Sequence, residues 1–311
     1  MNNPNIDISV VVPMYCEEEN IQNSITTIMN IVDQLNVNYE LIIIDDGSTD
    51  KTWKLISDLA KQISNIKGIS FSRNFGKENA LYAGLSYSRG SAVITIDGDL
   101  QHPPELILEM YKLWEYDSIE VVDIKKSKRP KEPIFYKMSS FLFYYFFKKL
   151  SGIDIANATD FKLLDRKVVD SILLLPESQR FYRGITNWVG FNHVTIETVI
   201  SERKFGKSKW DWANLSKYAI NNISSFTSRP LIFIGSLGLL FLFSAIILMI
   251  ISIIRIITGT TQEGFPTVIL LMLFIGGSVI ISQCLIGFYL SKVFDEVKNR
   301  PSFIIKELIN L

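Results

Sequence analysis

Two aspartates stand one residue apart at the end of an apolar run, in the segment VITIDGDLQHPPE of residues 93–105. Neighbouring carboxylates repel each other, so such a pair needs a cation, a cationic side chain or open water beside it. Asp97 and Asp99 would share one face of an extended chain, and Gly98 between them lets the backbone bend and a ligand approach closely. Gln101 adds a neutral oxygen. These residue types favour a bound cation.

The donor set indicates which cation to expect. Hard oxygen donors suit Mg²⁺ or Mn²⁺, which take one or two protein carboxylates and fill their other positions with water and substrate phosphates. A zinc site is not expected, because His102 and His193 are the only histidines and neither cysteine has the spacing of a metal ligand. For His102 we expect a structural or supporting role rather than direct ligation.

The elements that must position these acids follow from the pattern of residues 1 to about 120. Apolar strand-like runs alternate there with helix-like segments; the runs are ISVVVP, ELIIIDDGS, IKGISFSR and SAVITIDGD. This alternation predicts right-handed crossovers and an α/β fold, with a doubly wound, parallel-rich sheet and helices on both faces. The nearly continuous apolar character of the runs is typical of strands that are buried on both sides.

Polar residues collect where these predicted strands end, and in open α/β sheets that edge binds ligands. They are Pro13, Tyr15 and Glu17 after the first strand, Asp45 and Asp46 after the second, and Asp97 and Asp99 after the fourth. The segment 46–50, DGSTD, can form a turn that caps the next helix, can present N–H groups and an acid to a ligand, or can do both. A G-x-G-x-x-G loop and a Walker A sequence are absent, which argues against a dinucleotide oxidoreductase and a P-loop NTPase.

Two apolar stretches near the C-terminal end predict a membrane hairpin. Residues 231–254 and 264–291 carry no charge, and at about 1.5 Å per residue each exceeds the roughly 30 Å hydrocarbon core of a bilayer. We predict spans at about 231–254 and 266–290. Basic residues flank both outer ends, whereas the short turn between the spans offers only Arg255. By the positive-inside rule both ends are cytoplasmic. Buried helices of a large soluble core are the less favoured alternative.

The predicted organisation has three parts. Residues 1–210 form a cytoplasmic domain, residues 211–229 a juxtamembrane amphipathic helix, and residues 230–311 the transmembrane hairpin with a short cytoplasmic tail. Within the first part, the aromatic segment 136–150 is interpreted either as an interfacial helix or as core packing. The expected location is therefore the plasma membrane, with the chain crossing it more than once.

Several motifs together resemble one enzyme family. The segments VVVPMYCEEEN, IIIDDGSTDKT, FSRNFGKENALYAGL and IDGDLQHPPE occur in the order and at about the spacing of family 2 glycosyltransferases. With ATDFKLLDRKVVD, RFYRGITNWVGF and RKFGKSKW ahead of the apolar stretches, the chain resembles the polyisoprenyl-phosphate branch, to which bactoprenol glucosyltransferase and dolichol-phosphate mannosyltransferase belong. The resemblance covers essentially the whole chain and implies a GT-A-like fold.

The resemblance also implies a role for individual residues. The residues implied to bind the nucleotide-sugar are Pro13, Tyr15, Glu17, Asp45, Asp46, Lys77, Asp97, Gly98, Arg203 and Lys209. The implied catalytic residues are Asp97, Asp99 and Asp160. Asp97 is implied to lie near the sugar or metal, and Asp99 and Gln101 to ligate Mg²⁺ or Mn²⁺. Lys126 stands where many relatives carry an arginine that meets the acceptor phosphate. Asp160 matches a base or orienting acid; the alternative is that it caps a helix over FKLLDRKVVD.

The implied reaction is inverting transfer of a sugar, from UDP-glucose or a UDP-N-acetylhexosamine, to undecaprenyl phosphate. Such an enzyme would work with a flippase and a downstream glycosyltransferase, and small residues in the spans would permit a homo-oligomer. Two alternatives stay open. A processive polysaccharide synthase is disfavoured because Gln179 is followed by RFYRG, which is not the Gln-x-x-Arg-Trp signature. A membrane-anchored sugar-nucleotide sensor would keep the fold without turnover.

Overall fold

The computed structural model describes residues 6–128, 158–177, 180–199 and 264–311, together with Lys149 and single positions between 236 and 258. It divides into two compact units. Unit 1 comprises Met1–Trp210 with Pro301–Leu311, and unit 2 comprises Asp211–Arg300.

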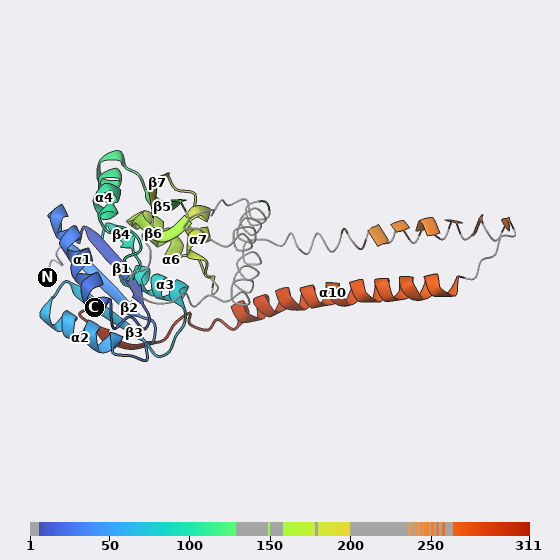
Figure 1. Ribbon diagram of the computed structural model, residues 1–311, viewed down its shortest axis with the longest axis horizontal. Helices are drawn as coiled ribbons and strands as arrows, with labels where there is room; N and C mark the ends of the chain where they lie inside the picture. Colours follow the sequence, from blue (N-terminus) through green and yellow to red (C-terminus); the bar gives the residue numbers. More distant parts are fainter. Residues whose placement is uncertain are drawn as a thin grey trace. The chain divides into compact units, whose positions relative to one another are not determined.

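Unit 1 is built on an eight-stranded sheet in the order β7-β5-β6-β4-β1-β2-β3-β8 (Figure 1). Its strands are β1 Ile8–Met14, β2 Tyr39–Asp45, β3 Ile66–Phe71, β4 Ala92–Thr95, β5 Val121–Lys128, β6 Ala158–Asp165, β7 His193–Val199 and β8 Ile305–Ile309. The four strands predicted from residues 1 to about 120 are confirmed, and β1, β2, β3 and β4 form a continuous parallel group. Antiparallel pairs join β4 to β6, β5 to β6 and β3 to β8, so the sheet as a whole is mixed.

The helices cover both faces of this sheet, as predicted. They are α1 Ile21–Val32, the short 3₁₀ helix η1 Asp33–Leu35, α2 Thr52–Gln62, α3 Lys77–Tyr87, α4 Leu106–Asp117, α6 Arg166–Leu173 and α7 Tyr182–Trp188. Helices α1, α2 and α4 pack on one face, and α3 and α6 pack on the other. The alternating residues of β1 show why: Val10 and Val12 join the core under α1, whereas Val11 points to Gly84 of α3. This two-sided burial explains the uninterrupted apolar runs.

Strand β8 was not predicted from the sequence. Only a short cytoplasmic tail was expected after the second span, whereas Ile305–Ile309 pair antiparallel with β3 at the sheet edge. Side chains reinforce the pairing, because the Trp53 indole donates to Glu307 Oε2 at 2.8 Å. The Asn310 amide donates to the carbonyl oxygens of Ala60 and Ile66 at 2.7 and 2.9 Å. Residues on both sides of unit 2 in sequence therefore belong to one sheet.

Unit 2 contains the long helix α10, Phe265–Val297. Its 33 residues span about 50 Å at about 1.5 Å per residue, which is more than the roughly 30 Å hydrocarbon core. Among the described residues, the stretch Phe274–Val297 of this helix is the one candidate membrane span, with a mean hydropathy of 1.6. The ring of Phe241 lies 4.9 Å from that of Phe274 in an edge-to-face contact. The structure describes only scattered positions of the stretch 231–254, so the predicted hairpin is not confirmed.

Gly47 closes the turn after β2 and tolerates no side chain there. Its φ is +67°, and a Cβ would lie 2.2 Å from the carbonyl carbon of Arg73. We expect Gly47→Ala to lower the free energy of unfolding by roughly 1–3 kcal/mol or more, because a left-handed alanine adds backbone strain to this clash. Gly76→Ala is the matched control, since Gly76 also has a positive φ but a Cβ there would meet nothing within 4 Å. Equal losses in denaturant titrations of the two variants would contradict the role assigned to the clash.

Candidate functional site

The predicted polar residues do meet at the carboxyl edge of the parallel strands. Met14 at the end of β1 pairs with Asp45 at the end of β2, and β4 pairs with β1 up to Thr95. The loop after β1 is fastened to the loop after β2, because the backbone N–H groups of Cys16 and Glu17 donate to the hydroxyls of Ser48 and Thr52 at 2.9 and 3.0 Å. Tyr15, Glu17 and Asp46 were all predicted at this edge, and the structure places their loops there. Pro13 lies one residue before Met14 on β1 itself.

Asp45 and Asp46 are both buried and both hold backbone turns. Asp45 accepts the Ser48 N–H and the Ser70 hydroxyl, each at 3.1 Å. Asp46 accepts the N–H groups of Phe75 at 2.7 Å and Gly76 at 2.9 Å, directly before α3. Burial raises the pKa of Asp46 to about 6, although these two N–H groups oppose the rise. The segment therefore does form a turn, although the N-cap of α2 is Lys51, which makes no side-chain cap. Asp46 fixes the loop that presents Lys77.

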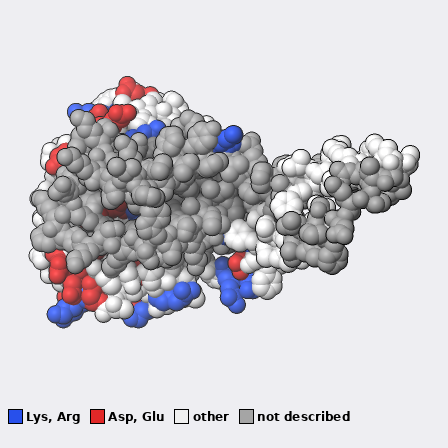
Figure 2. Space-filling model, turned by 45° about the vertical axis from the view of Figure 1, so that its right-hand side comes forward, with Lys and Arg blue, Asp and Glu red and all other residues white. Residues whose placement is uncertain are grey.

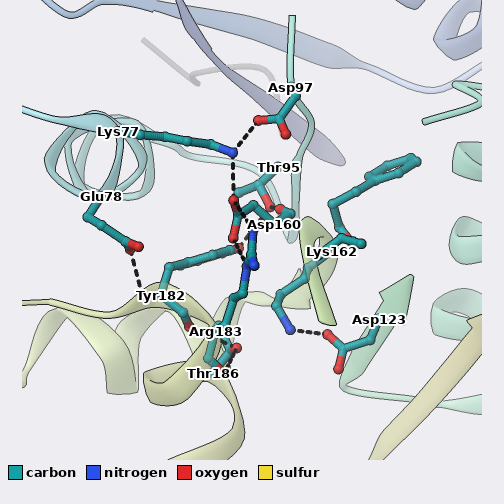
Figure 3. A network of polar contacts seen from close by, with 12 residues as sticks. Lys77, Glu78, Thr95, Asp97, Asp123, Asp160, Lys162, Tyr182, Arg183 and Thr186 are labelled. Atoms are coloured by element: carbon teal, nitrogen blue, oxygen red, sulfur yellow. Dashed lines mark hydrogen bonds and ion pairs between the residues drawn. The ribbon is translucent and has the colours of Figure 1, made fainter. Parts of the chain in front are cut away.

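The centre of the site is an ion-pair network of Asp97, Lys77, Asp160 and Arg183 (Figure 3). Lys77 Nζ lies 2.6 Å from Asp97 Oδ1 and 2.5 Å from Asp160 Oδ2. Arg183 holds the same Asp160 with two nitrogens, Nε at 2.7 Å and Nη2 at 2.9 Å. The four groups come from the end of β4, the start of α3, the middle of β6 and α7. Charges of alternating sign thus neutralise each other along the network.

The network sets unusual pKa values. Burial alone would raise the pKa of Asp160, but Arg183 and then Lys77 hold it well below its usual range. Burial opposes the charge of Lys77, yet Asp160 and Asp97 raise the pKa of its ammonium above its ordinary value. Both groups are therefore fully charged near neutral pH. A carboxylate held ionised in this way is a weak base, so its geometry favours an orienting role over proton abstraction.

A second polar chain continues from Asp160 across the same face of the sheet (Figure 3). The Thr95 hydroxyl donates to the Asp160 carbonyl oxygen at 2.6 Å and lies 2.9 Å from the Tyr182 hydroxyl. Farther along, fully buried Lys162 pairs with Asp123, and Asp123 also contacts His193. Burial by itself would raise the pKa of Asp123, but Lys162 and His193 lower it. These buried pairs hold β6 against β5 and so support Asp160.

The acidic loop after β4 offers the oxygen donors that a divalent cation needs. The chain turns sharply after Asp99, since Leu100 has a φ of 51°, and the Gln101 N–H donates to Asp99 Oδ1 at 3.1 Å. The Gly98 carbonyl oxygen accepts the Ser24 hydroxyl at 2.5 Å, which anchors the loop to α1. Among the described residues, no group of three His, Cys, Asp or Glu side chains is assembled for a metal. Mg²⁺ and Mn²⁺ need only one or two carboxylates, so partly exposed Asp99 and Gln101 fit such an ion.

Two further predictions at this loop concern Gly98 and His102. A Cβ on Gly98 would lie 2.8 Å from the terminal methyl of Met14, a flexible group that can shift. An alanine at this position would therefore need only a small adjustment. His102 is buried with its ring 5.9 Å from that of Phe161, which agrees with the structural role expected for it.

The remaining predicted residues are only partly described. Lys126 lies in β5 opposite Thr198 of β7, but its side chain is outside the described part of the structure. Arg203, Lys209 and most of the segment 136–150 also lie outside it. For Asp160 the helix-cap alternative is wrong, because ATDFKLLD forms β6 and the next helix begins at Arg166.

Sequence reasoning missed Arg183 and Glu78. Each residue was noted only as part of a motif, Arg183 within RFYRG and Glu78 within FSRNFGKENALYAGL. Glu78 Oε2 accepts the Tyr182 N–H at 2.7 Å, which links α3 to α7. Burial, followed by the charge of Asp160, raises the pKa of Glu78 to about 7. An acid next to a lysine at a helix start is a common pattern, so no local signal marked either residue.

Glu78 gives the network a pH-dependent contribution to stability. Its pKa is about 7 in the folded protein against an ordinary value of 4.5, so the folded state retains a proton that the unfolded chain releases. This stabilisation is complete below about pH 4.5 and is lost as the pH rises through about 7. We expect Glu78→Gln, which cannot ionise, to match wild type in thermal midpoint near pH 5 and to exceed it near pH 8. A midpoint difference that is the same at both pH values would contradict the assignment.

Acidic and basic side chains are mixed on the described part of the face that Figure 2 shows, where they lie beside one another along its lower edge. The whole sequence carries 32 basic and 32 acidic residues. The net charge therefore does not indicate a charged partner, and local groups such as those of the ion-pair network are the more informative feature.

Comparisons with known proteins identify the family of this chain. The profile described as "Glycosyl transferase family 2" matches residues 9–173. A protein of Synechocystis sp. named as an uncharacterized glycosyltransferase is 38% identical over 98% of this chain and 96% of its own length. The SfII prophage-derived bactoprenol glucosyl transferase of Shigella flexneri is 36% identical over 96% of this chain and 97% of its own length.

Solved structures resemble the chain more distantly. The glucosyl-3-phosphoglycerate synthase of Mycobacterium tuberculosis, solved with Mn²⁺, UDP and phosphoglyceric acid, is 22% identical with a TM-score of 0.48. That similarity covers 70% of this chain and 76% of the synthase. The profile match and the relatives similar along nearly the whole chain decide the assignment: this chain belongs to glycosyl transferase family 2 and resembles its polyprenyl-phosphate branch.

Proposed function

We propose that the protein transfers a sugar, with inversion, from a nucleotide-sugar to polyprenyl phosphate. UDP-glucose or a UDP-N-acetylhexosamine is the proposed donor, and undecaprenyl phosphate is the proposed acceptor. The observation that carries this proposal is the ion-pair network at the carboxyl edge of the sheet, where Lys77 bridges Asp97 and Asp160. The name of the Shigella relative, a bactoprenol glucosyl transferase, supports the acceptor class.

The network can stabilise the leaving group of such a reaction. The leaving diphosphate gathers negative charge, and the Lys77 ammonium lies at the edge where the loops after β1, β2 and β4 meet. A positively charged group that is already in place stabilises that charge without reorganising. Asp97 and Asp160 restrain Lys77 from two sides, so that its ammonium has a defined position before the donor binds.

A divalent cation, when bound by Asp99 and Gln101, would add Lewis-acid stabilisation of the same diphosphate. This chain's own residues prepare for it: the sharp turn at Leu100 and the Ser24 contact to Gly98 fix the acidic loop. Arg203 and Lys209 are proposed to add further positive charge there.

The acceptor needs little help from a base. A phosphate monoester is already largely ionised near neutral pH, because its second pKa is about 6. Arg183 and Lys77 keep Asp160 ionised and oriented, and we assign Asp160 the role of anchor for these two cations. Lys126 is proposed to meet the acceptor phosphate as a point charge.

Chain connectivity supports the proposed membrane hairpin. Because unit 1 contains residues on both sides of Asp211–Arg300, that segment must begin and end on one side of any membrane it crosses. An even number of crossings is therefore required, and α10 supplies one candidate. The contact between Phe241 and Phe274 within unit 2 is what a second helix beside α10 would make.

The test is a product assay with a panel of donors. Membranes that contain the protein would be incubated with undecaprenyl phosphate and radiolabelled UDP-glucose, UDP-N-acetylglucosamine, UDP-galactose or GDP-mannose. We expect one UDP-sugar to give a chloroform-soluble product that mild acid hydrolyses. Donor binding without this product would instead support a sugar-nucleotide sensor. A long water-soluble polymer would support a processive synthase.

A further inference from the structure

The residues that lead into β8 touch α3, which supplies Lys77, and the segment just before α7, which supplies Arg183. The ring of Phe303 stacks on that of Phe71, with centroids 5.0 Å apart and planes 14° apart. The same ring meets Tyr82 of α3 at 6.3 Å with its plane tilted by 63°. The Ser302 hydroxyl accepts a hydrogen bond from Arg180 Nη1 at 2.8 Å. Two consecutive residues of the C-terminal segment thus contact α3 and the chain before α7.

Arg180 joins these two contacts. Its guanidinium carbon lies 3.4 Å from the centroid of the Tyr82 ring, a cation–π contact. Its Nη2 donates to the Leu175 carbonyl oxygen at 3.2 Å. Tyr82, Arg180, Ser302 and Phe303 therefore form a closed set of contacts, which we call the C-terminal clamp.

Two members of the clamp, Tyr82 and Arg180, are close in sequence to residues of the network. Tyr82 follows Glu78 by four residues on α3, so the two side chains lie on the same side of the helix. Arg180 stands three residues before Arg183. Helix α3 is therefore fastened to the start of α7 twice, through Glu78 and the Tyr182 N–H, and through Tyr82 and Arg180. The C-terminal segment touches only the second of these two fastenings among the contacts described.

We propose that Phe303 is a positioning residue: through Tyr82 and Arg180, it sets the distance between Lys77 and Arg183 around Asp160. This inference rests on the proposed catalytic role of the network. Strand β8 has its own anchors in Trp53–Glu307 and in the backbone pairing with β3. Removing the Phe303 ring therefore loosens the clamp while the strand stays in the sheet. Positioning and folding are separable in this region.

The experiment compares three variants of the full chain in liposomes that contain undecaprenyl phosphate. Phe303→Ala removes the ring, Phe303→Tyr retains it, and Leu308→Ala is the control. Leu308 pairs with Ile69 in the same strand and is 47% exposed. The measurements are the thermal midpoint, kcat and KM for the nucleotide-sugar, and backbone hydrogen exchange over residues 77–83 and 180–188.

We expect Phe303→Ala to lower kcat of the folded enzyme about tenfold, because small displacements of catalytic groups are costly, with KM for the donor changed by less than about twofold. Phe303→Tyr should restore kcat, and Leu308→Ala should leave it unchanged. Exchange should accelerate at residues 78–83 and 180–188 in Phe303→Ala alone. Wild-type kcat in Phe303→Ala, or faster exchange confined to β3 and β8, overturns the proposal.

The exchange measurement separates this inference from the proposed function, since it requires no substrate. If the wild-type protein makes no lipid-linked product, the proposed function fails and the exchange pattern still decides whether the clamp holds α3 to α7. If the wild-type protein is active but Phe303→Ala behaves like Leu308→Ala in both measurements, the clamp fails by itself.

Discussion

Replacing Lys77 with methionine is expected to lower kcat/KM for the nucleotide-sugar by roughly 10²–10³-fold, the range observed when one preorganised electrostatic group is removed from an active site. The substitution leaves Asp97 without its cationic partner, and Asp160 keeps only Arg183. It also removes a positive charge from the place where we expect the leaving diphosphate. Steady-state transfer to undecaprenyl phosphate, measured with the donor that wild type accepts, is the appropriate assay.

The matched control is Lys61→Met on α2, because the Lys61 side chain is 70% exposed and pairs only weakly with Asp58 at 3.7 Å. Exposed pairs of this kind contribute little to stability. Lys77→Arg keeps the charge in a different shape and should lie between methionine and wild type. If Lys77→Met retained more than about half of the wild-type activity, the network would be structural and the mechanism would need another source of positive charge.

Replacing Asp99 with asparagine is expected to remove metal-dependent transfer. The side chain is partly exposed in the loop after β4, so its loss should cost little packing and leave the unfolding transition near that of wild type. Because asparagine is a neutral and weaker ligand for Mg²⁺ or Mn²⁺, the activity at saturating metal should fall by about two orders of magnitude. Titrating the rate with each metal ion measures both the residual rate and the metal affinity.

Glu105→Gln serves as the control for charge, since Glu105 is exposed and lies six residues farther along the same loop. Its metal dependence should match that of wild type. A wild-type metal titration in Asp99→Asn would show that the acidic loop does not hold the ion. In that case Asp97 and Asp99 would have to interact with the substrate by other means.

The parallel half of the fold was predictable because each of its strands is buried on both sides. Residues such as those of Leu41–Ile44 have no exposed side, so the sequence shows an unbroken apolar run that ends at the acids. Parallel pairing then places Asp45 and Asp97 at the same edge. The position of the site therefore followed from local pattern together with one topological rule.

Strand β6 was not predictable in the same way because its burial includes charge. Lys162 is fully buried in the middle of the strand, where it is neutralised by Asp123 from β5. In a sequence, a lysine predicts an exposed position, so ATDFKLLD does not show the unbroken apolar run of a buried strand. A helix over FKLLDRKVVD was therefore kept as an alternative. Its partner is 39 residues away, so only the folded sheet explains why the charge is tolerated.

Arg183 and β8 escaped prediction for a related reason. The two hydrogen bonds from Arg183 join residues that are 23 positions apart. Strand β8, with the sequence IKELI, is short and mostly exposed, as edge strands are, so its pattern alone does not distinguish it from a tail. Both features depend on contacts between distant segments, and such contacts leave no periodicity in the sequence.

The late position of β8 in the chain also sets an order of events during synthesis. Strand β7 ends at Val199 and β8 begins at Ile305, so about a hundred residues, including all of α10, are translated between them. At about 5–20 residues per second, the edge of β3 stays unpaired for several seconds or more before β8 emerges from the ribosome. The protein therefore completes its sheet, and its C-terminal clamp, only after α10 has been made. A nascent chain that ends before Ser302 still lacks the segment that we expect to position Lys77 and Arg183.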